Sequence, residues 1–153
     1  MSDKDKLLQT NKKAYFNYEI LETLECGIEL VGSEVKSMRA NRFSFQDSWV
    51  KVESGSLYLI NFTIEPYKES SIFNHKRNRE RRLLAHKQEV KRLRRKVEEK
   101  GLTLVVTKIY IKGNLIKAEV AVARGRNLVN KKNVIKDRDI KRDIAREIKN
   151  KNY

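Results

Sequence analysis

The sequence predicts one mainly β domain whose six antiparallel strands form a sheet or a closed barrel. Two pairs of segments have the pattern of β-hairpins because each pair flanks a glycine-containing turn: 48–52 with 57–64, and 102–111 with 115–123. In the second hairpin both faces are largely apolar, which is typical of strands at the centre of a sheet or in a barrel wall. A chain of 153 residues is long enough to bury one modest core.

The N-terminal part supplies the other two expected strands. Residues 1–11 are mostly polar and charged, so we expect a flexible lead-in there. The barrel domain is expected over 12–123, with strands at 18–24 and 28–31 and a bend near Gly27 between them.

Two helices are expected within this domain. Ser33 can accept a hydrogen bond from the free amides of a first helical turn, which predicts a short helix over 33–39. A longer helix is predicted over 79–100, where apolar residues recur at helical spacing and Gly101 follows. Lysines and arginines cover the other faces of that segment, so the helix would be electropositive along the domain surface.

We expect residues 124–153 to form a basic C-terminal tail, because strand alternation ends before Arg124. Ile140, Ile144 and Ile148 stand four residues apart, beside Asp–Lys and Asp–Arg pairs that favour a helix. A single isoleucine stripe buries too little area to stabilise an isolated helix. The tail is therefore expected to be disordered in the free protein and helical when bound to a partner.

Positive charge is concentrated in two segments of the chain. Residues 76–100 carry 12 Lys and Arg against 4 Asp and Glu, and residues 124–153 carry 11 against 4. These segments account for the formal net charge of +15, because the charges elsewhere cancel. Each phosphate that a cation neutralises releases counterions, so a polyanion would be the natural partner. We therefore predict a nucleic-acid binder; the alternative is two solvated basic helices that keep a small protein in solution.

The sequence predicts no cofactor and no metal site. His75 and His86 are eleven residues apart and have only Cys26 as a further zinc ligand, so no usual Cys/His spacing is present. His75 is instead a candidate RNA contact by stacking or hydrogen bonding, or a plain loop residue. We expect no enzymatic activity. The enzyme alternative is a Mg²⁺-dependent nuclease, suggested by the Glu-x-Lys pattern at Glu34 and Lys36.

The aromatic side chains are assigned mainly to the core. Phe43, Phe45 and Trp49 are expected there, and so is Tyr18 at the start of the first strand. Tyr18 could instead offer a stacking surface to RNA, next to phosphate contacts made by Lys12.

No membrane segment is expected. The longest uncharged stretch, residues 54–64, is far shorter than the ~20 apolar residues that cross a bilayer. The single cysteine and the lack of an export signal at the start of the sequence favour a cytoplasmic location.

Five blocks of residues carry a resemblance to a known family. They are Asn11–Tyr15, Gly32–Ala40, Asp47–Val50, Arg81–Lys87 and Val122–Arg126, and the likeness continues at Asp137–Asp139. In this order and spacing they resemble the small protein B family, the transfer-messenger-RNA-binding proteins of bacterial ribosome rescue. The resemblance covers nearly the whole chain.

The resemblance implies a fold, a function and a set of partners. The fold would be a closed six-stranded antiparallel β-barrel of the oligonucleotide-binding type, with accessory helices and the basic tail. The protein would bind the tRNA-like domain of transfer-messenger RNA and deliver it to stalled ribosomes for trans-translation, which rescues the ribosome and tags the incomplete peptide. The tail would probe the empty mRNA channel and the small-subunit decoding centre. Alanyl-tRNA synthetase and elongation factor Tu would be indirect partners.

An alternative stays open beside this one, a general RNA-binding or ribosome-associated barrel protein without specificity for transfer-messenger RNA. The functional positions of the family carry over residue by residue. The resemblance implies RNA contacts at Asn11, Lys12, Glu25, Glu34, Lys36, Arg39, His75, Arg81, Arg82 and Leu84. It implies ribosome contacts in the tail at Arg124, Arg126, Lys131, Lys132, Ile144 and Ile148. Leu84 would pack on an unstacked base or, in the alternative, within the core.

Overall fold

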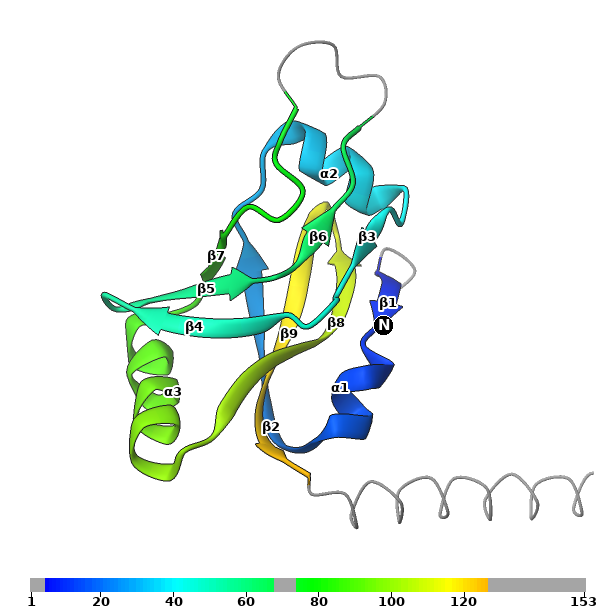
Figure 1. The fold of residues 1–153 in the computed structure, drawn as a ribbon. Helices are drawn as coiled ribbons and strands as arrows, with labels where there is room; N and C mark the ends of the chain where they lie inside the picture. Colours follow the sequence, from blue (N-terminus) through cyan, green and yellow to red (C-terminus); the bar gives the residue numbers. More distant parts are fainter. Residues whose placement is uncertain (1–4, 68–73, 127–153) are drawn as a thin grey trace, which may run out of the picture.

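Nine strands and three helices make up residues 5–67 and 74–126, the part of the chain that the computed structural model describes (Figure 1). The elements are β1 (Lys6–Thr10), α1 (Lys12–Asn17), β2 (Tyr18–Ile28), α2 (Gly32–Arg39), β3 (Phe43–Ser44), β4 (Trp49–Glu53), β5 (Ser56–Ile60), β6 (Thr63–Ile64), β7 (Arg81–Leu84), α3 (Lys87–Lys100), β8 (Thr103–Lys112) and β9 (Leu115–Gly125).

Seven of the strands form one sheet in the order β1-β8-β9-β2-β7-β5-β4, and β3 pairs with β6 in a second, two-stranded sheet. The mainly β class is confirmed. The strand count of six is wrong for three reasons: the short strands β1, β3 and β7 have little local signal, one expected strand divides into β5 and β6, and the two strands expected at 18–24 and 28–31 are replaced by the single strand β2. In the hydrogen-bonded order β1 and β4 lie at the two ends. Closure of this sheet into a barrel stays a prediction.

The hairpin of β8 and β9 lies inside the large sheet, as its apolar character predicts. Leu104 and Val106 point to the main core, while Val105, on the other face, packs with Ala121 and with Ala14 of α1. Helix α1 therefore covers the second apolar face of the hairpin. This explains why both faces are apolar, since neither of them is left open to water.

Strand β2 is continuous, where two strands with a bend were expected. It pairs with β9 from Tyr18 opposite Gly125 to Gly27 opposite Lys117, with a register shift between Ile20 and Glu22. Long pairing on one side keeps β2 extended through Gly27. Because β9 runs to Gly125, the start of the tail is also corrected: Arg124 belongs to the strand and lies 3.7 Å from the Glu19 carboxylate.

The end of the described C-terminal segment is fixed by one further contact. The backbone amide of Arg126 donates to the carbonyl of Asn17 at 2.9 Å. Lys131, Lys132, Ile144 and Ile148 lie outside the described residues.

The flexible lead-in is wrong for residues 6–10, which form the edge strand β1. This strand pairs with β8, and Leu8 packs into the core. Asn11 then starts α1: its Oδ1 accepts from the amide of Ala14 at 3.2 Å, and its Nδ2 donates to the carbonyl of Val106 at 3.0 Å. The partner strand is about 100 residues away in sequence, so the local pattern could not show it.

The long helix begins at Lys87 and not at residue 79. Residues 81–84 form β7, which lies between β2 and β5 in the sheet. Arg81 and Leu83 are buried, whereas Arg82 and Leu84 are exposed. The predicted end of the helix is confirmed, since Gly101 has a φ of 63° and follows α3 directly. The shorter helix is confirmed as α2, but the predicted cap at Ser33 is wrong: the helix begins at Gly32, and Glu34 accepts from the Val31 amide.

Within the described ranges, no helix combines the length and the apolar character needed to span a bilayer.

Candidate nucleic-acid interface

Three surface hollows adjoin one another around β7 and α3. The first is lined by residues of β2, α2 and the turn between β8 and β9, the second by residues of β2, β9 and the start of α3, and the third by the β4–β5 turn and α3. Leu84 lines the first and the second, and Ala85 lines the second and the third. We call this continuous area the β7 surface and define it by Glu25, Gly27, Arg82, Leu84, Ala85, Lys87, Lys91, Arg94, Asn114 and Lys117.

Leu84 is the exposed apolar residue at the middle of the β7 surface. Its side chain is 49% exposed, so the alternative that placed it in the core is wrong. Gly27 lies next to it on β2, where an added Cβ would contact the Cβ and Cδ1 atoms of Leu84 at 3.4 Å. Gly27 and Leu84 are cross-strand partners in the pairing of β2 with β7, and an added methyl group at position 27 would make an ordinary van der Waals contact with Leu84. An exposed leucine held in this way can pack against an unstacked base.

Glu25 lines the same hollow as Leu84 and provides a hydrogen-bond acceptor. The Oη atom of Tyr110 donates to its carboxylate at 2.5 Å, and Lys112 Nζ lies 3.5 Å away. The hydrogen bond from Tyr110 is the main reason that the pKa of Glu25 is lowered. Burial, followed by the same hydrogen bond, raises the pKa of Tyr110. Glu25 is thus ionised at neutral pH and can accept from a base amino group or a ribose hydroxyl.

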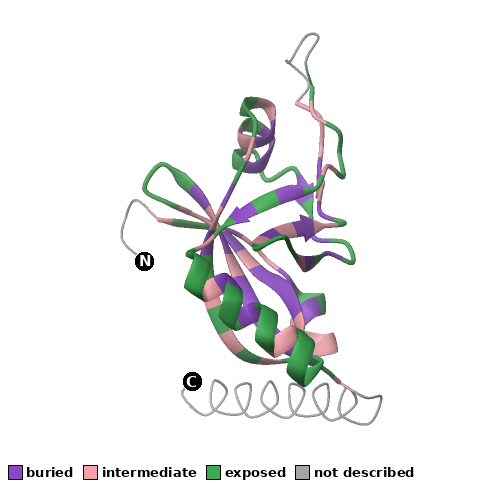
Figure 2. Ribbon diagram, turned by 90° about the vertical axis from the view of Figure 1, so that its left-hand side faces the viewer, coloured by how far each residue is buried: buried purple, intermediate pink, exposed green. Residues whose placement is uncertain are grey.

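Four cations lie along the third hollow: Arg82, Lys87, Lys91 and Arg94. All four are exposed, and Figure 2 shows that the outward face of α3 is exposed along its length. Arg94 donates to Glu98 at 3.0 Å in a solvent-exposed pair, which contributes little to stability and leaves the arginine able to change partner. This row of cations suits a phosphate backbone.

Other cations of α3 face β2 and are already paired. Glu22 lies 3.3 Å from Arg92 and accepts a hydrogen bond from Lys96. That hydrogen bond from Lys96 is the largest of the contacts that lower the pKa of Glu22. One carboxylate therefore offsets part of the positive charge on this side of α3, and the expected electropositive surface is strongest on the side that joins the β7 surface.

Glu34 and Arg81 are both 0% exposed, so the prediction that they contact RNA is wrong. The Oε2 atom of Glu34 accepts from Arg81 Nε at 2.5 Å, and its Oε1 accepts from Arg79 Nη2 at 2.6 Å and from the amide of Val31 at 2.9 Å. Arg81 also donates to the carbonyls of Phe62, Lys76, Arg77 and Arg79. The pair thus joins α2 to β7, to the segment just before β7 and to the chain before β6.

Glu34, the first residue of the Glu-x-Lys nuclease pattern, is engaged in this buried ion pair. Burial alone would raise the pKa of Glu34, but the hydrogen bonds from Arg79, the Val31 amide and Arg81 together lower it. Burial lowers the pKa of Arg81 and Glu34 opposes this change, so the guanidinium stays charged. Both carboxylate oxygens of Glu34 are occupied by cations. In residues 5–67 and 74–126, no three His, Cys, Asp or Glu side chains are grouped as metal ligands.

The other predicted RNA contacts lie around α1 and α2. Asn11 is 7% exposed and is used as the cap of α1, so it positions that helix instead of offering a free amide. Lys12 is exposed. On α2, Arg39 is exposed and donates from Nη2 to the carbonyl of Asn114 at 3.3 Å, which places it at one end of the β7 surface. Lys36 is also exposed and lies 5.3 Å from the ring centre of Tyr67.

His75 is half-buried, and both of its ring nitrogens have protein partners. Its Nε2 donates to the carbonyl of Ile64 at 2.9 Å, and Nδ1 lies 2.8 Å from the Ser33 hydroxyl. The predicted contact by hydrogen bonding is therefore not supported by this geometry, and only the ring face is left for stacking.

Comparisons with known proteins give a consistent result. The family model described as "SmpB protein" matches residues 8–150. The "SsrA-binding protein" of Treponema denticola is 48% identical over 144 residues, covering 94% of each chain, and that of Persephonella marina is 45% identical over 146 residues, covering 95% of this chain and 96% of the relative. A solved structure described as "tmRNA-SmpB: a journey to the center of the bacterial ribosome" has 47% identity and a TM-score of 0.66, covering 78% of this chain and 85% of that chain.

Proposed function

This chain belongs to the SmpB protein family, and from this premise we propose that it binds the tRNA-like domain of transfer-messenger RNA and delivers it to stalled ribosomes for trans-translation. The names of its relatives support the RNA partner, and the similar solved structure, whose description names the bacterial ribosome, supports the second partner. The protein would supply shape and charge and would catalyse no covalent step.

The β7 surface is the observation that carries this proposal. It combines an ionised acceptor at Glu25, an exposed apolar side chain at Leu84 and a row of cations that ends at Arg94. RNA is recognised through its phosphates, its ribose hydroxyls and its unstacked bases, and these three kinds of group can contact one such surface together.

The proposal extends to parts of the chain beyond the β7 surface. Residues 127–153 would enter the empty mRNA channel and the decoding centre of the small subunit, with Lys131 and Lys132 on ribosomal RNA and Ile144 and Ile148 lining the docked face. Alanyl-tRNA synthetase and elongation factor Tu would be linked to the protein only through the RNA. These steps take place in the cytoplasm.

RNA selectivity tests the first part of the proposal. We expect the protein to bind the tRNA-like domain of transfer-messenger RNA about 100-fold more tightly than bulk tRNA at 0.15 M salt, because base and shape contacts add to the shared phosphate contacts. Titration of both RNAs, with Mg²⁺ present and cleavage followed on gels, measures this ratio. Equal affinities would favour the general RNA-binding alternative. Mg²⁺-dependent cleavage that is lost in Glu34→Gln, under conditions where the variant is shown to be folded, would revive the nuclease alternative.

Truncation after Val129 tests the division between domain and tail. We expect the shortened protein to keep its affinity for the tRNA-like domain within about threefold, since the β7 surface is intact and that change is below 1 kcal/mol. Peptide tagging in a reconstituted translation reaction should be abolished. A large loss of RNA affinity would contradict the proposed division of labour.

A further inference from the structure

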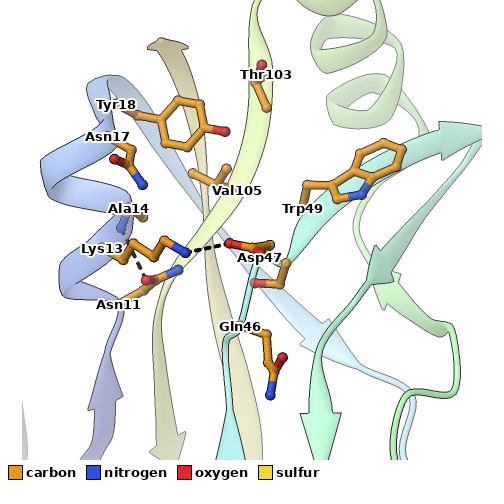
Figure 3. A pocket seen from close by; sticks show the side chains of 11 residues that line it. Asn11, Lys13, Ala14, Asn17, Tyr18, Gln46, Asp47, Trp49, Thr103 and Val105 are labelled. Atoms are coloured by element: carbon orange, nitrogen blue, oxygen red, sulfur yellow. Dashed lines mark hydrogen bonds and ion pairs between the residues drawn. The ribbon is translucent and has the colours of Figure 1, made fainter. Parts of the chain in front are cut away.

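A separate pocket lies between α1, the segment before β4, and β8 (Figure 3). Its volume is about 170 Å³, and it shares no lining residue with the β7 surface. We call it the Trp49 pocket; its lining includes Lys13, Asn17, Tyr18, Gln46, Ser48 and Trp49.

Ser48 lines the Trp49 pocket, and its hydroxyl is buried. Ser48 is only 8% exposed, and its Oγ atom has no hydrogen-bond partner among the described residues. Hydroxyl groups shielded from water are normally paired, because an unpaired one loses its hydration without compensation. A ligand that brings a donor or an acceptor into the pocket would pair with the hydroxyl once the Ser48 side chain turns toward the pocket.

Aromatic rings and amides supply the rest of a base-sized site. Trp49 was expected in the core, but it is 39% exposed, and Figure 3 shows it across the pocket from Tyr18 with Val105 between them. Every nucleobase has a π-face that can stack on such a ring. The side-chain amides of Asn17 and Gln46 each carry donors and an acceptor, which suit the polar edge of a base.

A cation lies at the same pocket. Lys13 Nζ is 2.6 Å from the Asp47 carboxylate, and both side chains are largely exposed, so the pair is screened by water. A phosphate can therefore replace Asp47 as the partner of Lys13. Stacking surface, polar edge contacts and a phosphate contact together describe one nucleotide.

We propose that the Trp49 pocket takes one unpaired nucleotide of the bound RNA, with its base stacked on Trp49 and its phosphate at Lys13. The Ser48 hydroxyl gains a hydrogen bond from the base. This inference rests on the proposed function, because the RNA that supplies the nucleotide is the one held at the β7 surface.

The intrinsic fluorescence of the protein tests the proposal, since Trp49 is the only tryptophan. Titrating the full chain with the tRNA-like domain of transfer-messenger RNA should quench the emission in step with binding measured by calorimetry. A fully paired RNA duplex should bind weakly and leave the emission unchanged. Trp49→Leu should weaken binding of the tRNA-like domain about tenfold, as expected for one lost base stack, whereas Trp49→Phe should keep most of the affinity.

Ser48→Ala separates a ligand contact from a structural role. It should weaken RNA binding about fivefold without lowering the melting temperature, because none of the described residues forms a hydrogen bond with the hydroxyl in the free protein. Binding without quenching, together with full affinity of Trp49→Leu, would overturn the pocket and leave the proposed function standing. Absence of binding by the unaltered protein would instead overturn the proposed function itself.

Discussion

Replacing Glu34 by glutamine is expected to lower the free energy of unfolding by about 3–5 kcal/mol. The substitution keeps the shape of the side chain but removes its negative charge. Arg81 would then be a fully buried cation without a counter-charge, next to Arg79, while its hydrogen bonds to four backbone carbonyls still hold it in place. Breaking one side of a buried ion pair costs much more than the pair contributes.

Urea denaturation at several pH values measures this effect. The pKa of Glu34 is lower in the folded than in the unfolded protein, so its contribution is present above the ordinary value of 4.5 and is lost as the pH falls through the folded pKa. Glu34→Gln lacks this contribution, and the difference in stability between the two proteins should therefore shrink on acidification. Glu22 and Glu25 also have lowered pKa values, but both proteins contain them. Their contributions to the pH dependence of stability therefore cancel in the difference between the two proteins.

Glu99→Gln is the matched control, because Glu99 is an exposed carboxylate on α3. It should change stability by less than about 0.5 kcal/mol. The double variant Glu34→Gln/Arg81→Met should recover only a small part of the loss, since no buried charge is left unpaired but the four carbonyls that accept from Arg81 lose their donor. A Glu34→Gln protein as stable as the control would contradict the role assigned to this pair.

Replacing Arg82, Lys91 and Arg94 by alanine is expected to weaken binding of the tRNA-like domain about 100-fold at 0.15 M salt, if each makes one phosphate contact. The same variant should reduce the slope of log K against log salt by up to about 3, because three fewer counterions are released. All three side chains are exposed at the β7 surface, so the fold should be unchanged. Affinity measured from 50 to 300 mM salt gives both quantities.

Removing the same charge elsewhere provides the control for that variant. Lys6, Arg42 and Lys76 are exposed and lie outside the β7 surface. Alanine at these three positions should lower the affinity only through the long-range field, by less than about tenfold. An equal loss in both triple variants would show that net charge, and not the β7 surface, determines binding.

Elements with a strong local pattern were predictable from the sequence. The hairpin of β8 and β9 is an example, because its apolar strands flank a glycine turn within one short segment. Strand β7 was not predictable in this way. Leu83 and Val90 are seven residues apart, a spacing that also fits a helix, and an arginine such as Arg81 is typical of a surface. The counter-charge that allows this arginine to be buried is Glu34, which lies 47 residues away in the sequence.

Part of the candidate site was also predictable from the sequence. Charge segregation indicated α3, and the family resemblance indicated Glu25 and Leu84, which line one hollow in the structure. The exposure of Trp49 was predictable from its neighbour in the sequence. Val50 is buried on β4, so alternation along the strand predicts an outward side chain at position 49. The buried hydroxyl of Ser48 has no signal in the sequence, because its burial depends on what surrounds it in space.

The pairing of β9 on both sides, together with the contact between the Arg126 amide and Asn17, gives the C-terminal segment a fixed point of attachment. If that segment binds the ribosome as proposed, the protein is a bivalent ligand whose two halves are linked at this point. Engagement of the RNA then makes the second association intramolecular, with an effective concentration that can reach about millimolar. Individually weak tail contacts would then be sufficient for stable binding to the ribosome. Inserting a long flexible spacer after Arg126 would reduce the avidity without removing any contact.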